Sequence, residues 1–212
     1  MTRRKPATAQ KTEGSGAKDV SLHRTVALVG LMGAGKTSVG QVLARRLSAP
    51  FADSDHEIER AAGLSVPEIF ARFGEGYFRD GERRVIARLL DGAPLILATG
   101  GGAYVEEETR RIIRDRAIVV WLRVDLDTLF ERVRGRAGRP LLANDDPKGT
   151  LARLAQSRAP SYGTADLIVD GRSGERHEAA AARILKALRA HDATASPETR
   201  ILDDPAPAAR TL

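Results

Sequence analysis

The eight residues from Gly30 to Thr37 constrain the fold of this chain more than any other stretch. Their sequence, Gly-Leu-Met-Gly-Ala-Gly-Lys-Thr, fits the pattern G-x-x-x-x-G-K-[ST], the P-loop that wraps nucleotide phosphates. The apolar run Thr25–Val29 before it is typical of a buried strand, and residues 38–47 after it are typical of a helix. A strand, a glycine-rich loop and a helix in this order predict an α/β domain.

The chemistry of this motif follows from its geometry. Glycines let successive backbone N–H groups converge on an anion, and a helix start adds its own unpaired N–H groups. The Lys36 ammonium can reach the terminal phosphates, and the Thr37 hydroxyl can ligate Mg²⁺. The alternative is a glycine-rich turn with a solvated lysine. The flanking strand and helix favour a nucleoside triphosphate site.

The composition excludes several classes of protein. The chain has 212 residues, enough for one domain, and its lack of cysteine excludes disulfides and thiolate metal sites. No apolar run approaches the roughly 18 residues that a membrane helix needs. We therefore expect a cytoplasmic protein with no membrane partner.

The formal net charge of +6 raises the question of nucleic-acid binding. Residues 1–20 carry five basic and two acidic side chains, so half of the excess charge lies there. Several other arginines fall beside the predicted phosphate site, where an anion pocket accounts for them. We therefore expect no nucleic-acid partner.

Both ends of the chain have compositions typical of disorder. Residues 1–22 have no apolar period and predict a disordered basic leader, and residues 191–212 predict a disordered C-terminal tail. A transit peptide is the alternative for the leader, but its two acidic residues disfavour it. We expect one folded domain over residues 23–190.

Within this domain, strand-like and helix-like segments alternate, which predicts an α/β sheet with right-handed crossovers. The predicted strands span residues 25–29, 51–55, 95–99, 118–122 and 167–170. The predicted helices span residues 38–47, 58–62, 66–73, 78–90, 106–114, 126–133 and 175–190. Ligands bind beyond the carboxyl ends of such strands, so residues at those ends are the candidates for chemistry.

Asp53 and Asp55 lie at the end of the second predicted strand. They lie two residues apart on that strand, so both can face the same side. Two carboxylates near a P-loop suit the water ligands of Mg²⁺ and a substrate hydroxyl. The alternative is that one of them caps the following helix. The position one crossover after the P-loop favours a functional pair.

Gly100, Gly101 and Gly102 follow the third predicted strand. Three consecutive glycines cost conformational entropy on folding. A ligand that lies directly against the backbone would account for this cost. A permissive turn is an equally good explanation from this stretch alone.

Two arginine-containing segments complete the candidates. Arg79 and Glu82 are three apart on a predicted helix, so Glu82 can hold the guanidinium for a carboxylate; a surface ion pair is the alternative. Residues 132–142 form a Gly- and Arg-rich loop that suggests a lid over the phosphates; a solvated basic loop is the alternative.

Taken together, these segments resemble the shikimate kinase family, in order, from about residue 25 to about residue 170. The resemblance implies a three-layer α/β/α fold of the nucleoside-monophosphate-kinase type, with a five-stranded parallel sheet, a substrate-binding region and a lid. The matching motifs are Gly30–Ser38, Phe51–Asp55, Gly74-Glu75 with Phe78-Arg79 and Glu82, Gly100–Gly102, Arg139–Leu142, and Arg158–Pro160 with Tyr162.

The resemblance also implies roles toward ATP and Mg²⁺. Lys36 would contact the transferred phosphate, Thr37 would hold Mg²⁺, and Asp53 would act on the metal through water. Arg139 would reach the γ-phosphate from the lid. An arginine that stacks on adenine is expected just before Arg139, and Arg134 and Arg136 both compete for that role. The implied ATP-binding residues are Gly33, Ala34, Gly35, Lys36, Thr37, Ser38 and Arg139.

On the acceptor side, the resemblance implies that Asp55 hydrogen-bonds the reacting hydroxyl and is the best candidate base. Arg79 and Arg158 would pair with the carboxylate of shikimate. Gly101, with Gly100 and Gly102, would pack against the ring and donate backbone hydrogen bonds. Lys36, Asp55 and Arg139 would form the catalytic set.

We therefore expect an ATP-dependent kinase that makes shikimate 3-phosphate, in the biosynthesis of chorismate and the aromatic amino acids, and that acts as a monomer. A related small-molecule kinase is the first alternative, because gluconate also carries a carboxylate. A non-catalytic nucleotide-binding switch is the second. The presence of Lys36, Thr37, Asp55 and Arg139 argues against the switch.

Overall fold

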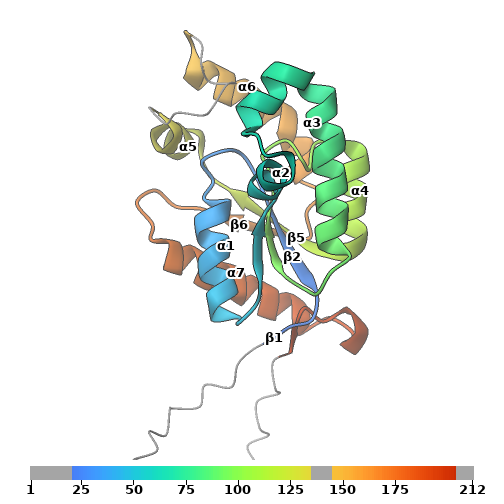
Figure 1. The fold of residues 1–212 in the computed structure, drawn as a ribbon. Coiled ribbons are helices and arrows are strands. Elements are labelled where there is room, and N and C mark those ends of the chain that lie inside the picture. Colours follow the sequence, from blue (N-terminus) through green and yellow to red (C-terminus); the bar gives the residue numbers. More distant parts are fainter. Residues whose placement is uncertain (1–20, 135–144, 204–212) are drawn as a thin grey trace, which may run out of the picture.

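A five-stranded, entirely parallel sheet forms the centre of the molecule (Figure 1). The structure is a computed structural model and describes residues 21–134 and 145–203. The strand order is β3-β4-β2-β5-β6. The strands are β2 (Thr25–Val29), β3 (Phe51–Asp53), β4 (Ile96–Ala98), β5 (Ala117–Arg123) and β6 (Leu167–Asp170).

Helices cover both faces of this sheet. Helices α1 (Lys36–Arg46) and α7 (His177–Asp192) lie on one face, and α3 (Val66–Leu90) and α4 (Glu107–Arg116) lie on the other (Figure 1). The remaining helices are α2 (Ser54–Ala62), α5 (Leu126–Val133), α6 (Pro147–Tyr162) and the 3₁₀ turn η2 (Pro197–Thr199). The predicted three-layer α/β/α fold is confirmed.

Strand burial explains why the central strands are apolar throughout. Every residue of β2 and β4 is buried, as expected where helices cover both faces of a parallel sheet. Leu28 of β2 pairs with Ala98 of β4 and with Val120 of β5. This register brings the carboxyl ends of the three strands to one edge, where the P-loop and the glycine turn begin.

The second predicted strand is shorter than expected. It ends at Asp53, and Asp55 lies in the first turn of α2 rather than on the strand. The physical reason is an N-cap: the Asp53 carboxylate accepts the Asp55 backbone N–H at 3.0 Å, which allows the helix to begin at Ser54.

The two helices predicted at residues 66–73 and 78–90 form the single kinked helix α3. The kink lies at Gly74, whose φ of 81° and ψ of 174° are not helical. Residues other than glycine rarely adopt this φ, so Gly74 allows the chain to change direction there.

The C-terminal segment differs from the predicted loose tail. Strand β7 (Leu202–Asp203) pairs with β1 (Ser21–Leu22), and Ile201 is fully buried. The Asp192 carboxylate accepts the backbone N–H groups of Ile201 and Leu202, each at 2.9 Å. The folded part therefore extends to residue 203, because these two apolar side chains enter the core in a segment too short to show a periodic pattern.

The predicted disorder of residues 1–20 and 204–212 lies outside the described residues. Within the described ranges, none of the helices combines the length and the apolar character that crossing a bilayer requires.

Candidate active site

The P-loop links β2 to α1 and leads directly into the helix. Gly35 is the N-cap of α1 with a φ of 93°, in the left-handed region, which explains the glycine at this position. The buried Lys36 side chain folds back over the loop, and Nζ donates to the carbonyl oxygens of Gly30 at 2.8 Å and Leu31 at 3.0 Å. The predicted phosphate-binding loop therefore has the expected strand–loop–helix geometry.

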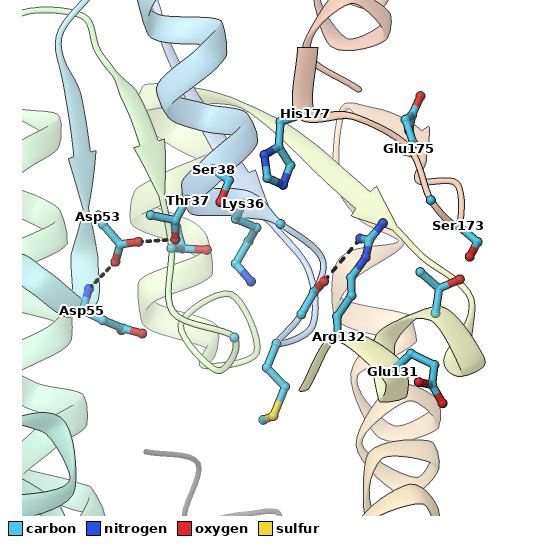
Figure 2. A pocket seen from close by; sticks show the side chains of 17 residues that line it. Lys36, Thr37, Ser38, Asp53, Asp55, Glu131, Arg132, Ser173, Glu175 and His177 are labelled. Carbon is cyan, nitrogen blue, oxygen red and sulfur yellow. Dashed lines mark hydrogen bonds between the residues drawn. The ribbon is translucent and has the colours of Figure 1, made fainter. Parts of the chain in front are cut away.

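Asp53 connects the P-loop to α2. The Thr37 hydroxyl donates to Asp53 Oδ2 at 2.6 Å, and Asp53 Oδ1 accepts the Asp55 N–H (Figure 2). The alternative raised by the sequence, helix capping, is therefore correct for Asp53, but the second carboxylate oxygen faces the P-loop. One residue serves both purposes because its two oxygens have different partners.

The side-chain oxygen atoms of Thr37 and Asp53 are suitable ligands for a magnesium ion. Mg²⁺ prefers oxygen ligands and usually keeps several waters, so one hydroxyl, one carboxylate and substrate phosphates suffice. Thr37 and Asp53 supply these two oxygens at hydrogen-bond distance from each other. The described residues contain no cluster of three or more His, Cys, Asp or Glu that would form an all-protein metal site.

A cavity of about 610 Å³ opens over the P-loop. Figure 2 shows Asp53 and Asp55 on one side of the loop and Arg132 and His177 on the other. Its lining residues are Met32, Gly33, Gly35–Ser38, Asp53, Asp55, Thr99, Gly101, Thr128, Glu131, Arg132, Ser173–Glu175 and His177. The size suits a drug-sized or nucleotide-sized ligand.

Two of the three glycines that follow β4, Gly100 and Gly102, lie where protein side chains leave no room for a Cβ. A Cβ at Gly100 would lie 2.5 Å from Asp55 Oδ1 and 2.8 Å from Glu82 Oε1, and one at Gly102 would lie 2.5 Å from the Arg79 guanidinium. None of the three has a positive φ. Gly100 and Gly102 therefore provide space for side chains rather than backbone freedom, whereas a Cβ at Gly101 would meet its neighbours at ordinary contact distances of 3.4 Å or more.

This glycine turn brings the two predicted carboxylate-binding arginines together. Arg79 donates to the buried Glu82 carboxylate at 2.7 Å and to the exposed Glu75 at 3.0 Å. Arg158, on α6, is 9% exposed and donates to the Gly101 carbonyl at 2.8 Å. Arg79 thus lies against Gly102 and Arg158 against Gly101, although 79 positions separate the two arginines in the sequence numbering.

A family model described as shikimate kinase matches residues 32–189. The chain belongs to the shikimate kinase family. Among its relatives, shikimate kinase of Bradyrhizobium diazoefficiens is 53% identical over 168 residues, which cover 79% of this chain and 81% of that protein. The shikimate kinase of Ruegeria pomeroyi is 51% identical over 183 residues, which cover 84% of this chain and 94% of that protein.

Solved structures of the family have the same fold. The shikimate kinase from Acinetobacter baumannii in complex with shikimate has a TM-score of 0.77 at 38% identity, covering 79% of this chain and 94% of that one. The shikimate kinase from Aquifex aeolicus has a TM-score of 0.69 at 32% identity, covering 79% of this chain and 97% of that one. The resemblance stated from the motifs is confirmed.

The cavity is also lined by Arg132, for which the sequence predicts no role beyond membership of the loop at residues 132–142. Arg132, in the last turn of α5, lines the cavity and donates to the Gly33 carbonyl at 3.4 Å and the Arg172 carbonyl at 3.0 Å. Arg134, one of the two predicted candidates, is 69% exposed and lies 3.8 Å from Glu131. The other candidate, Arg136, and the predicted lid residue Arg139 lie outside the described residues.

The loop after β6 was also missed. Ser173, Gly174 and Glu175 line the cavity together with His177, the first residue of α7. Their residue types carry no motif, and the one available signal was position, because ligands bind beyond the carboxyl end of a parallel strand.

The carboxyl groups around Gly100 have shifted pKa values. Burial, together with the nearby Asp53 carboxylate, raises the pKa of Asp55, while Lys36 and Arg79 oppose this shift. Burial also raises the pKa of Glu82 to about 7, against the opposing effect of Arg79. Glu82 Oε1 has no hydrogen-bond partner among the described residues, consistent with a strongly desolvated carboxyl group.

The raised pKa of Glu82 predicts a pH-dependent contribution to stability. The folded protein holds this proton up to about pH 7, whereas the ordinary pKa of 4.5 governs the unfolded chain. The resulting stability is complete below about pH 4.5 and is lost as pH rises to about 7. Glu82→Gln stays neutral, so its Tm relative to wild type should rise over this window in a thermal-melt series.

The matched control is Glu75→Gln. This change removes the exposed carboxylate partner of Arg79 and leaves the buried one in place, so the pH slope of the wild type should persist. A constant Tm difference between Glu82→Gln and wild type would contradict a buried carboxyl group that ionises near pH 7.

Proposed function

We propose that this protein transfers the γ-phosphoryl group of ATP to a hydroxyl of shikimate, producing shikimate 3-phosphate and ADP. This reaction would place it in the biosynthesis of chorismate and the aromatic amino acids. The observation that carries the proposal is the glycine turn at residues 100–102. Asp55, Arg79 and Arg158 all lie against this turn, at the edge of the sheet where the P-loop would bind phosphate. Membership of the shikimate kinase family supports the choice of substrate.

The donor side positions ATP. The P-loop residues Gly33, Ala34, Gly35 and Ser38 would cradle the phosphates with their backbone groups and the start of α1. Lys36 would turn from the loop carbonyls toward the transferred phosphate, and Arg139 would contribute from the lid. Thr37 and Asp53 would hold Mg²⁺, the second through water. When bound, Mg²⁺ neutralises charge on the phosphates.

The acceptor side positions shikimate. Arg79 and Arg158 would pair with its carboxylate, and the backbone of Gly100, Gly101 and Gly102 would lie against its ring. Arg79 is suited to this role because Glu82 and Glu75 hold its guanidinium, and a planar guanidinium fork matches a carboxylate.

Asp55 would accept the proton of the reacting hydroxyl. The hydroxyl oxygen then forms the new bond to the γ-phosphorus, and the bond from that phosphorus to the β-γ bridging oxygen breaks. Burial raises the pKa of Asp55, which makes its carboxylate a better proton acceptor, and Lys36 limits the shift. Phosphoryl transfer depends mainly on positioning and charge, so a modest base suffices.

Arg132 would cover the nucleoside half of ATP. Lys36 and Thr37 fix where the phosphates lie, and the cavity continues past them to Arg132 and His177 (Figure 2). We therefore propose Arg132 for the adenine-facing role, for which the sequence predicts Arg134 or Arg136.

ADP release, coupled to a spectrophotometric readout, tests the proposed function. We expect turnover with millimolar shikimate and little with gluconate, since the paired arginines and the glycine turn suit a small carboxylated ring and gluconate is an open chain. No turnover on shikimate would refute the proposal. Preference for gluconate would favour a related small-molecule kinase, and ATP binding without turnover on either compound would favour a nucleotide-binding switch.

Asp55→Asn tests the role of the carboxylate. We expect kcat to fall about 100-fold or more because the proton acceptor is lost, with the Kd for ATP changed less than about twofold. Glu57→Gln is the control, because Glu57 lies on the same helix but pairs with Arg60 and Arg88. Near-normal turnover by Asp55→Asn would show that this carboxylate is not the base.

Arg132→Ala tests the nucleotide side. We expect the KM for ATP to rise about tenfold, in line with the loss of a desolvated guanidinium over an aromatic base, and the KM for shikimate to stay unchanged. Arg134→Ala removes the same charge two residues away from an exposed position and should leave both KM values unchanged. The reverse pattern would return the role to Arg134.

We further propose that the protein acts in the cytoplasm as a monomer, without nucleic-acid or membrane partners. The absence of a nucleic-acid partner is supported by the position of the basic charge, since half of its excess lies in residues 1–20. Gel filtration with light scattering tests the oligomeric state.

A further inference from the structure

The carbonyl oxygen of Gly101 accepts two side-chain hydrogen bonds. The Tyr162 hydroxyl donates to it at 2.5 Å, and Arg158 donates at 2.8 Å. Tyr162 is 1% exposed and lies at the end of α6, four residues after Arg158. Burial raises the pKa of Tyr162, so its hydroxyl stays protonated and can donate. The proposed function gives Arg158 a role but leaves Tyr162 without one.

Gly101 lies where the two halves of the proposed site meet. A Cβ at this residue would lie 3.5 Å from the backbone nitrogen of Met32 and 3.8 Å from the carbonyl oxygen of Gly30, both in the P-loop. The same Cβ would lie 3.4 Å from the Arg158 guanidinium. A small shift of Gly101 would therefore change the distance between the phosphate loop and the acceptor side.

The ring of Tyr162 and the start of the P-loop both contact Trp121. It packs against Trp121 of β5 with ring centroids 5.7 Å apart. Trp121 in turn touches the start of the P-loop, since a Cβ at Gly30 would lie 3.4 Å from Trp121 Cδ1. The aromatic pair thus supports both loops, and the hydroxyl adds a directional contact that phenylalanine would lack.

The peptide plane extends the effect of this hydrogen bond. The structure contains no cis peptide bond among its described residues, so the Gly101 C=O and the Gly102 N–H point in opposite directions within one rigid plane. Fixing the carbonyl therefore fixes the direction of the Gly102 N–H. Gly102 is the residue against which the Arg79 guanidinium lies.

We infer that Tyr162 is a positioning residue: its hydroxyl fixes the Gly101 carbonyl and, through it, the orientation of the glycine turn and of Arg158 toward the acceptor. The inference rests on the proposed function, because the glycine turn and Arg158 are its acceptor-binding elements. Tyr162 itself does not contact the acceptor in this account. Its effect should therefore appear in the use of the acceptor and not in the binding of ATP.

Tyr162→Phe tests the inference, because it keeps the ring against Trp121 and removes one oxygen atom. We expect kcat/KM for shikimate to fall about five- to tenfold, the change that follows from losing one buried hydrogen bond. The KM for ATP should change less than about twofold. Calorimetric titration should show the same weakening of the shikimate Kd without turnover.

Tyr104→Phe is the matched control. Tyr104 is also fully buried, and its hydroxyl pairs with Thr164 Oγ1 at 3.2 Å instead of with the glycine turn. Tyr104→Phe should lose about as much thermal stability as Tyr162→Phe. It should leave the KM for ATP and the KM for shikimate unchanged. The emission of Trp121, the single tryptophan of the chain, checks that the ring packing survives in Tyr162→Phe.

The outcomes separate this inference from the proposed function. If the wild type does not turn over shikimate, the proposed function fails and the inference fails with it. If the wild type is active and Tyr162→Phe resembles Tyr104→Phe in both KM values, the inference alone is overturned. Equal losses for ATP and shikimate in Tyr162→Phe would indicate a general structural role and would also overturn it.

Discussion

The close approach of charged side chains to the bare backbone of residues 100–102 is the constraint on which the rest of the site depends. Asp55 and Glu82 lie against Gly100, and Arg79 lies against Gly102, at distances that no Cβ would permit. These side chains come from α2 and α3, which are separate in sequence from the turn. With a Cβ at Gly100 or Gly102, the acid and the arginine that the proposed reaction needs could not keep these positions at one edge of the sheet.

A second link joins the donor and acceptor halves through Asp53. One oxygen of its carboxylate starts α2 by capping it, and the other accepts the Thr37 hydroxyl of the P-loop. Because α2 carries Asp55, the helix that presents the proposed base is anchored to the loop that would hold the phosphates. In the proposed reaction, these two contacts would set the geometry between the hydroxyl of the acceptor and the phosphate, and phosphoryl transfer depends on such positioning.

Much of the fold was predictable because local patterns are strong in a covered parallel sheet. The apolar runs of β2, β4 and β5 and the P-loop motif gave the strand–loop–helix order directly. The short strand β7 and the buried Ile201 were not predictable, because two apolar residues in a polar segment have no period. Arg132 was missed for a related reason: several arginines lie close together in this segment, and nothing local distinguishes the one that faces the cavity.

The sequence by itself determined the class of fold, the phosphate loop and the family, because each of these depends on residue types at fixed spacing along the chain. Only the tertiary structure decided why Gly100 and Gly102 are glycines and that Asp53 serves as both cap and partner of Thr37. It also decided which hydroxyl holds Gly101. These features depend on atoms that are distant in sequence and meet only when the strands of the sheet align, so no local pattern records them.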